Sequence, residues 1–129
     1  MGTIRQFEDI DAWQKARELT RKVYQFAANG AFSRDFALRN HIRSAAVSIM
    51  GNIAEGYERG GNKEFLQFLA IAKGSCGEVR SYLHVALDQR YLTPEQHREA
   101  CEKAMEVSRM LSGLMKHLRG SDMRGNKYA

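Results

Sequence analysis

The stretch SIMGNIAEG, Ser48–Gly56, decides how this chain folds. It lies inside a segment, 34–58, whose apolar residues recur at spacings of three and four, which is the period of a helix. The stretch nevertheless holds two glycines, Gly51 and Gly56. Each costs roughly 1 kcal/mol relative to alanine in a helix interior. Glycines at that cost indicate a helix that must pass close to another element.

A matching pattern in the next helical segment indicates which element that is. Small or polar residues form one stripe on each helix: Ser44, Ser48, Gly51 and Glu55 on the first, and Gln67, Ala70, Gly74, Gly77 and Ser81 on the second. If the chain folds back at 59–61, Ser48 meets Gly74 and Gly51 meets Ala70. We therefore expect these two helices to be the closest pair, with small residues in direct contact. The alternative is that the glycines are merely tolerated.

The apolar periodicity of the whole chain predicts four helices, at about 9–28, 34–58, 62–90 and 94–119. The last has the clearest start, with Thr93 as N-cap, Pro94 in the first turn and Gln96 closing a capping box. The short connections predict an all-α fold, an antiparallel up-down-up-down four-helix bundle with a left-handed twist. We expect one domain, 1–119, in which Gly120 ends the last helix, and a mobile C-terminal tail, 120–129.

Three polar residues near the fold-back point receive structural roles in this prediction. Glu55 lies at the C-terminal end of its helix, where the macrodipole disfavours an anion. We expect Glu55 to accept hydrogen bonds from the free amides of the next helix, with Asn62 as that helix's N-cap. Asn52 is interpreted as a polar residue that fixes the register of the helices.

Composition indicates a single globular domain of 129 residues, 43% of them hydrophobic and 27% charged. No apolar run approaches the roughly 20 residues of a membrane span, and the N-terminus does not resemble a signal peptide. Two cysteines without an export signal favour a reducing cytoplasm. We therefore expect a cytoplasmic protein with no membrane partner.

The net charge of +5 is spread evenly along the chain. Basic residues exceed acidic ones by one in each of the segments 1–33, 34–61, 62–92 and 93–119. Any basic surface must therefore be assembled by folding or by oligomerisation.

Three segments carry a resemblance to a known family: QFEDIDAWQKARELT, LRNHIRSAAVSIMGNIAEGYERG and FLAIAKGSCGEVRSYL. They resemble the four-helix-bundle family named for proteins encoded in intervening sequences of bacterial 23S ribosomal RNA genes. The residues that match its structural signature are Ser48, Asn52, Ile53, Ala54, Glu55, Gly56, Gly74, Ser75 and Glu78.

The bundle is also similar to the accessory variability determinant proteins of diversity-generating retroelements. The resemblance implies a homo-oligomer, expected to be a pentamer. It also implies contact with RNA or DNA, and a reverse transcriptase or another protein as partner. It implies no chemistry.

The residues themselves offer no catalytic motif of the phosphate-binding, nucleophile-elbow or metalloprotease kind. We therefore predict no enzyme activity, no cofactor and no metal. The histidines do not have the spacing of metal ligands, and we interpret Cys76 as a buried core thiol. Trp13 and Phe26 are interpreted as core or subunit contacts rather than a platform for base stacking. The histidines are His41, His84, His97 and His117.

Two pairs of arginines are the candidate nucleic-acid-binding residues. Arg39 and Arg43 lie in the N-terminal half of their predicted helix, where the macrodipole disfavours cations. Arg17 and Arg21 form a second pair one turn apart. In a ring of subunits these pairs would form a basic band that contacts phosphates without base specificity. Alternatively, Arg39 or Arg43 pairs with a carboxylate across a helix or subunit boundary.

The leading function hypothesis is a non-enzymatic oligomeric protein that binds RNA or DNA. The alternative is a protein–protein interaction scaffold that binds no nucleic acid.

Overall fold

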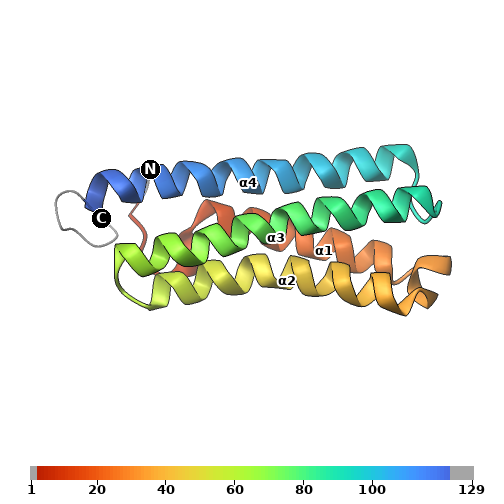
Figure 1. Ribbon diagram of the computed structural model, residues 1–129, viewed down its shortest axis with the longest axis horizontal. Helices are drawn as coiled ribbons and strands as arrows, with labels where there is room; N and C mark the ends of the chain where they lie inside the picture. Colours follow the sequence, from red (N-terminus) through yellow and green to blue (C-terminus); the bar gives the residue numbers. More distant parts are fainter. Residues whose placement is uncertain (1–2, 123–129) are drawn as a thin grey trace.

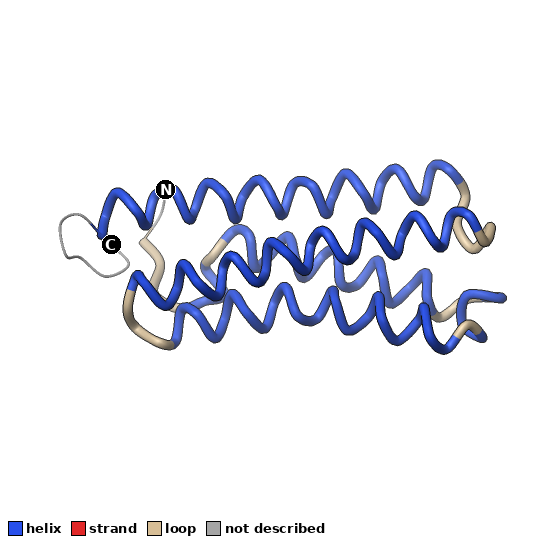
Figure 2. Tube along the Cα trace, in the orientation of Figure 1, coloured by secondary structure: helices blue, strands red, loops and turns tan. Residues whose placement is uncertain are grey.

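The computed structural model describes residues 3–122 and is all-α over that range, without a strand. Figure 1 shows long helices side by side, each running opposite to the one before it. Figure 2 shows that the connections lie at the two ends of the bundle. The predicted fold class is therefore confirmed, and the left-handed twist stays a prediction. The elements are η1 (Phe7–Asp9), α1 (Asp11–Ala27), η2 (Gly30–Arg34), α2 (Phe36–Glu58), α3 (Asn62–Asp88) and α4 (Pro94–Asp122).

The apolar seams of the four helices meet along the axis of the bundle. The heptad positions of α3 and the central ones of α4 are completely buried, as the spacing predicts. In α3 these residues are Phe65, Leu69, Ala72, Cys76, Val79, Leu83 and Ala86, and in α4 they are Ala100, Ala104, Val107 and Leu111. Burying this apolar surface supplies the main force that holds the helices together.

Local hydrogen bonds fix where two helices begin. The predicted capping box of α4 is present, because Gln96 N donates to Thr93 Oγ1 at 3.1 Å and Thr93 N donates to Gln96 Oε1 at 2.9 Å. Helix α2 begins at Phe36 rather than residue 34, because Asp35 Oδ1 accepts a hydrogen bond from Leu38 N and makes Asp35 the N-cap.

The predicted cap on α3 is wrong. Glu55 accepts a hydrogen bond from Arg59 Nη2 at 2.7 Å instead of meeting the α3 amides. Arg59, the C-cap of α2, lies one turn after Glu55, so its guanidinium is close enough to bind the Glu55 carboxylate. It also lies 3.5 Å from Glu64. Gly61 is the N-cap, and Asn62 is the first residue of α3. The Asn62 amide instead reaches the carbonyl of Leu118 on α4 at 3.4 Å.

Two helix ends also differ from the prediction. Helix α3 ends at Asp88, and Arg90 adopts a left-handed backbone with φ of 63°. Tyr91 N then donates to Ala86 O at 2.9 Å, which is the six-to-one bond of a Schellman motif. Helix α4 does not stop at Gly120 but continues to Asp122. The rest of the predicted mobile tail, 123–129, lies outside the described residues.

Helices α2 and α3 make the most extensive contact of any helix pair in residues 3–122, as predicted. A hydrogen bond of 3.0 Å joins Ser48 Oγ and Ser75 Oγ across this contact. The amide of Asn52 donates to the Ser48 carbonyl at 2.8 Å and to its hydroxyl at 3.0 Å. Asn52 therefore orients Ser48, the serine that bridges the two helices. Both of these Asn52 hydrogen bonds lie within α2.

The predicted small-to-small packing is wrong for three of the glycines. A Cβ added at Gly51, Gly74 or Gly77 would meet nothing within 4 Å, because these positions face away from the contact. Gly56 is the glycine at the close approach. A Cβ there would lie 2.7 Å from Phe68 Cβ and 3.0 Å from Phe65 Cδ1.

Adding one methyl group to Gly56 should therefore destabilise the bundle. Gly56→Ala is expected to lower the free energy of unfolding by about 1–3 kcal/mol, because Phe68 Cβ is fixed to its backbone and cannot yield. Gly113→Ala is the matched control in α4, where the added Cβ meets nothing within 4 Å. That control should stabilise by about 0.5–1 kcal/mol. Urea titrations of both variants measure the effects, and equal effects would contradict the packing described for Gly56.

The left-handed backbone at Arg90 gives a second prediction. Arg90→Gly should raise the free energy of unfolding by about 0.5–1 kcal/mol, because a non-glycine residue is strained in that conformation. Gln89→Gly is the control, since Gln89 has φ of −83° and gains nothing from glycine. Thermal unfolding should show a higher midpoint for the first variant and a lower one for the second. A lower midpoint for Arg90→Gly would contradict this account of the turn.

Candidate nucleic-acid interface

Helix α1 directs its lysines toward acidic residues of α4. Lys22 lies 3.8 Å from Glu99, and Lys15 lies 3.9 Å from Glu106. In the opposite sense, Lys103 of α4 donates to Glu18 Oε1 at 2.8 Å. This hydrogen bond and the charge of Lys103 lower the pKa of Glu18, with a further contribution from Lys15. The α1–α4 side of the bundle is therefore locally neutralised.

Three of the four arginines, Arg17, Arg39 and Arg43, lie against aromatic rings instead. The guanidinium carbon of Arg43 is 4.9 Å from the centre of the Tyr24 ring, which links α2 to α1. That of Arg17 is 5.7 Å from the Trp13 ring. Within residues 3–122, none of the four predicted arginines makes an ion pair. We call the following set the arginine face: Arg17, Arg21, Arg39 and Arg43, with Trp13, Tyr24 and Phe36.

The two arginines of α2 are partly committed to the fold. Arg39 Nη1 donates to the Ser33 carbonyl in η2 at 3.0 Å, and its guanidinium lies 4.8 Å from the Phe36 ring. Arg43 Nε is buried and has no hydrogen-bond partner in the part of the chain that the structure describes. Arg17 and Arg21 of α1 are exposed. The exposed pair is therefore freer to reach a ligand than the pair on α2.

Contacts between α1 and α2 set the order of the arginines along the bundle. Arg43 lies level with Tyr24, and Thr20 Oγ1 donates to the Ala46 carbonyl at 3.3 Å one turn further on. A helix rises about 1.5 Å per residue. The arginines therefore follow one another at axial intervals of about 4–6 Å, in the order 39, 43, 21 and 17.

Guanidinium groups beside aromatic rings offer two kinds of contact to a nucleic acid. The guanidinium presents several N–H donors in a plane that matches a phosphate. The ring faces offer surfaces on which bases stack. Sequence reasoning found the four arginines but assigned Trp13 to core or subunit contact. Trp13 does pack against the core, and it also contacts Arg17.

The signature residues divide between the α2–α3 contact and the surface beside it. Gly56 is buried there and Ser75 is only 4% exposed. Gly74 and Glu78 are exposed on α3. The signature therefore marks a helix contact on the side of α2 away from Arg43. Its members are Ser48, Asn52, Ile53, Ala54, Glu55, Gly56, Gly74, Ser75 and Glu78.

The thiol predicted to lie in the core does so. Cys76 is completely buried, and burial raises its pKa to about 12 in spite of the nearby Arg80 and Lys73. It is therefore protonated at neutral pH and a poor nucleophile.

The expectation that the histidines have no ligand arrangement is wrong for His84 and His97. These two residues and Cys101 come together between α3 and α4. The spacing of four between His97 and Cys101 was the signal in the sequence that could have found them.

Within the described residues, no helix combines the length and the apolar character that crossing a bilayer requires.

The chain is similar to one protein family in sequence and to a solved structure in fold. The family model described as 23S rRNA-intervening sequence protein matches residues 8–113. A crystal structure of a protein of unknown function from the S23 ribosomal protein family, from Bacteroides thetaiotaomicron VPI-5482, superposes with a TM-score of 0.74. It is 23% identical, and the match covers 81% of this chain and 98% of that one. No curated protein matches the chain.

Proposed function

Because this chain belongs to the family of 23S rRNA-intervening sequence proteins, we propose that it is a non-enzymatic, oligomeric protein that binds RNA or DNA through the arginine face. The phosphate backbone is the chemical group recognised, and binding is independent of base sequence. The family's name refers to ribosomal RNA, which agrees with a nucleic-acid ligand but assigns none.

The observation that carries this proposal is the separation of cations on α1. Lys15 and Lys22 lie near glutamates of α4, and their charges are compensated within the chain. Arg17 and Arg21, on the same helix, have no acidic partner in residues 3–122. An uncompensated row of arginines keeps the positive potential that attracts phosphates.

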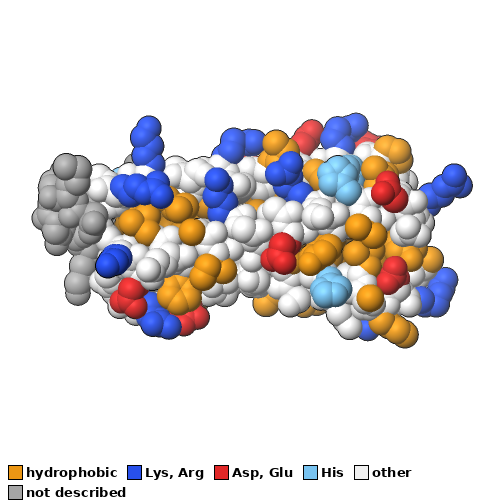
Figure 3. Space-filling view, in the orientation of Figure 1, with side chains coloured by type: hydrophobic (Ala, Val, Ile, Leu, Met, Phe, Trp, Pro, Cys, Tyr) orange, Lys and Arg blue, Asp and Glu red, His pale blue; other side chains and the backbone are white. Residues whose placement is uncertain are grey.

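A second part of the proposal is that the ligand-binding form is a homo-oligomer, a pentamer in the form that the resemblance implies. The outer face of α2 and α3 supports self-association because it combines exposed apolar and small residues. Val47 is 47% exposed and Ile71 is 53% exposed, and Gly51 and Gly74 lie beside them in the helical repeat. Figure 3 shows that the middle of this face carries few charged side chains. A surface with exposed apolar residues and few charges is suited to contact with another protein surface.

Two double variants of α1 test the nucleic-acid proposal with equal loss of charge. Arg17→Gln with Arg21→Gln should weaken binding to a single-stranded RNA and to a duplex DNA of equal length. It should also flatten the dependence of log K on log salt, by about 0.7–0.9 for each phosphate that the variant no longer neutralises. Lys15→Gln with Lys22→Gln is the matched control and should change binding little. Filter-binding titrations at several salt concentrations measure both.

Three outcomes of this experiment would contradict the arginine face as the binding site. They are equal losses of affinity in the two double variants, no change in the arginine variant, and no salt-sensitive binding by the wild type. The last outcome would favour the protein–protein scaffold. Circular dichroism on the same samples establishes that both variants fold.

Light scattering tests the oligomer independently. The wild type should have about five times the 14.7 kDa mass of one chain. Val47→Glu with Ile71→Glu should reduce that mass, because charges would be buried in the interface without partners. Met105→Glu, on α4 and 40% exposed, is the control and should leave the mass unchanged. A monomeric wild type would refute self-association, and dissociation by the control alone would place the interface on α4.

A further inference from the structure

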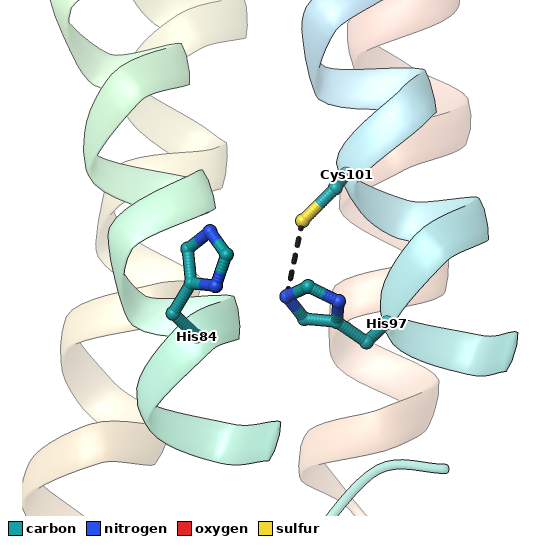
Figure 4. A group of neighbouring side chains, drawn as sticks. All are labelled: His84, His97 and Cys101. Carbon is teal, nitrogen blue, oxygen red and sulfur yellow. Dashed lines mark hydrogen bonds between the residues drawn. The ribbon is translucent and has the colours of Figure 1, made fainter. Parts of the chain in front are cut away.

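A group of three metal-binding side chains lies between α3 and α4, near the turn that joins them. Figure 4 shows His84 projecting from α3 toward His97 and Cys101 of α4. One ligand atom from each residue lies within 4.8 Å of the other two. The centres of the two imidazole rings are 4.7 Å apart, and Cys101 Sγ lies 3.4 Å from His97 Nε2.

Helical spacing and the bundle topology together produce this arrangement. His97 and Cys101 are separated by four residues and therefore project from the same side of α4. His84 lies in the second-last turn of α3, and the short connection 89–93 brings it level with the first turns of α4. Asp88 follows His84 by four residues, and its charge acts on His97. The His97–Cys101 contact alone would be an ordinary hydrogen bond within one helix, whereas His84 comes from a different helix.

The distances are close to those of a metal site. Zinc binds histidine nitrogen at about 2.0–2.1 Å and cysteine sulfur at about 2.3 Å, so its ligand atoms lie roughly 3.3–3.8 Å apart in a tetrahedron. The separation between His97 and Cys101 already falls in that range. His84 is exposed, so its ring is free to close the remaining distance of about 1 Å.

We propose that His84, His97 and Cys101 bind one divalent transition-metal ion, Zn²⁺ or an ion of similar ligand preference, with water or Asp88 in the fourth position. Two imidazoles and a thiolate suit zinc, cobalt, nickel or copper and do not suit Mg²⁺ or Ca²⁺, which prefer oxygen ligands. The metal bridges α3 and α4 and therefore stabilises the end of the bundle that holds their connecting turn.

The pKa shifts of the two α4 ligands act on metal binding in opposite directions. Burial, followed by the charge of His84, lowers the pKa of His97, which favours the neutral imidazole that binds metals. Burial raises the pKa of Cys101, and the nearby Arg80 partly opposes that shift. Metal binding must therefore displace the thiol proton, and one proton leaves for each ion bound.

Cobalt is the probe of choice because it reports a sulfur ligand directly. Titration of the reduced full-length chain with Co²⁺ should give a thiolate-to-metal charge-transfer band that saturates at one ion per chain and disappears when Zn²⁺ is added. Cys101→Ser should abolish the band. His84→Ala and His97→Ala should each weaken Co²⁺ binding at least tenfold.

Two variants serve as matched controls outside the group. His41→Ala removes an exposed histidine that packs against Tyr82, and Cys76→Ala removes the other cysteine. Neither should change the band or the affinity. Zn²⁺ should also raise the melting temperature of the wild type and of His41→Ala but not that of Cys101→Ser. His84 and Cys101 are not fully buried, so their variants are expected to fold, which circular dichroism checks.

Several results would overturn the proposal. One is the absence of a charge-transfer band at millimolar Co²⁺. Another is a band that survives in Cys101→Ser. A third is unchanged affinity in His84→Ala, which would leave only an ordinary hydrogen bond within α4.

Discussion

The close approach of α2 to α3 at Gly56 is the constraint on which the rest of the bundle depends. The absence of a side chain there lets Phe65 and Phe68 of α3 pack directly against the backbone of α2. Further toward the start of α2, the hydrogen bond between Ser48 and Ser75 holds the same two helices in one register. Because these two contacts fix α2 relative to α3, they also fix the apolar surfaces against which α1 and α4 pack.

In the folded bundle, the basic residues on the two sides of α1 have different neighbours. The side toward α4 meets glutamates, and lysines occupy it. The side toward α2 carries the rings of Trp13 and Tyr24, and Arg17 of α1 and Arg43 of α2 lie against them, because flat, weakly hydrated guanidinium groups pack well against rings. An even excess of basic residues along the sequence thereby becomes an uneven one on the surface. This folding-dependent asymmetry, rather than the net charge, is the basis of the proposed phosphate-binding surface.

The same geometry places the two proposed sites between different pairs of helices. Near the α3–α4 turn, His84, His97 and Cys101 converge. Tyr91 of that turn also donates its hydroxyl hydrogen to Asp35, the N-cap of α2, at 2.9 Å. A metal ion bound between α3 and α4 would therefore stabilise an end of the bundle that is already tied to the start of α2. The arginine face lies between α1 and α2, so the two proposed sites use different helix pairs.

The sequence by itself determined the fold class, the heptad seams and the capping box of α4, because these depend on spacings of three and four along one helix. It also identified the four arginines as unusual. Only the tertiary structure decided which way each stripe faces. Gly51, Gly74 and Gly77 share the period of a contact and yet point outward, since a rotation of one helix about its axis leaves the spacing unchanged. The partners of the arginines and the meeting of His84 with His97 depend in the same way on which helices are neighbours, and a linear pattern does not contain that information.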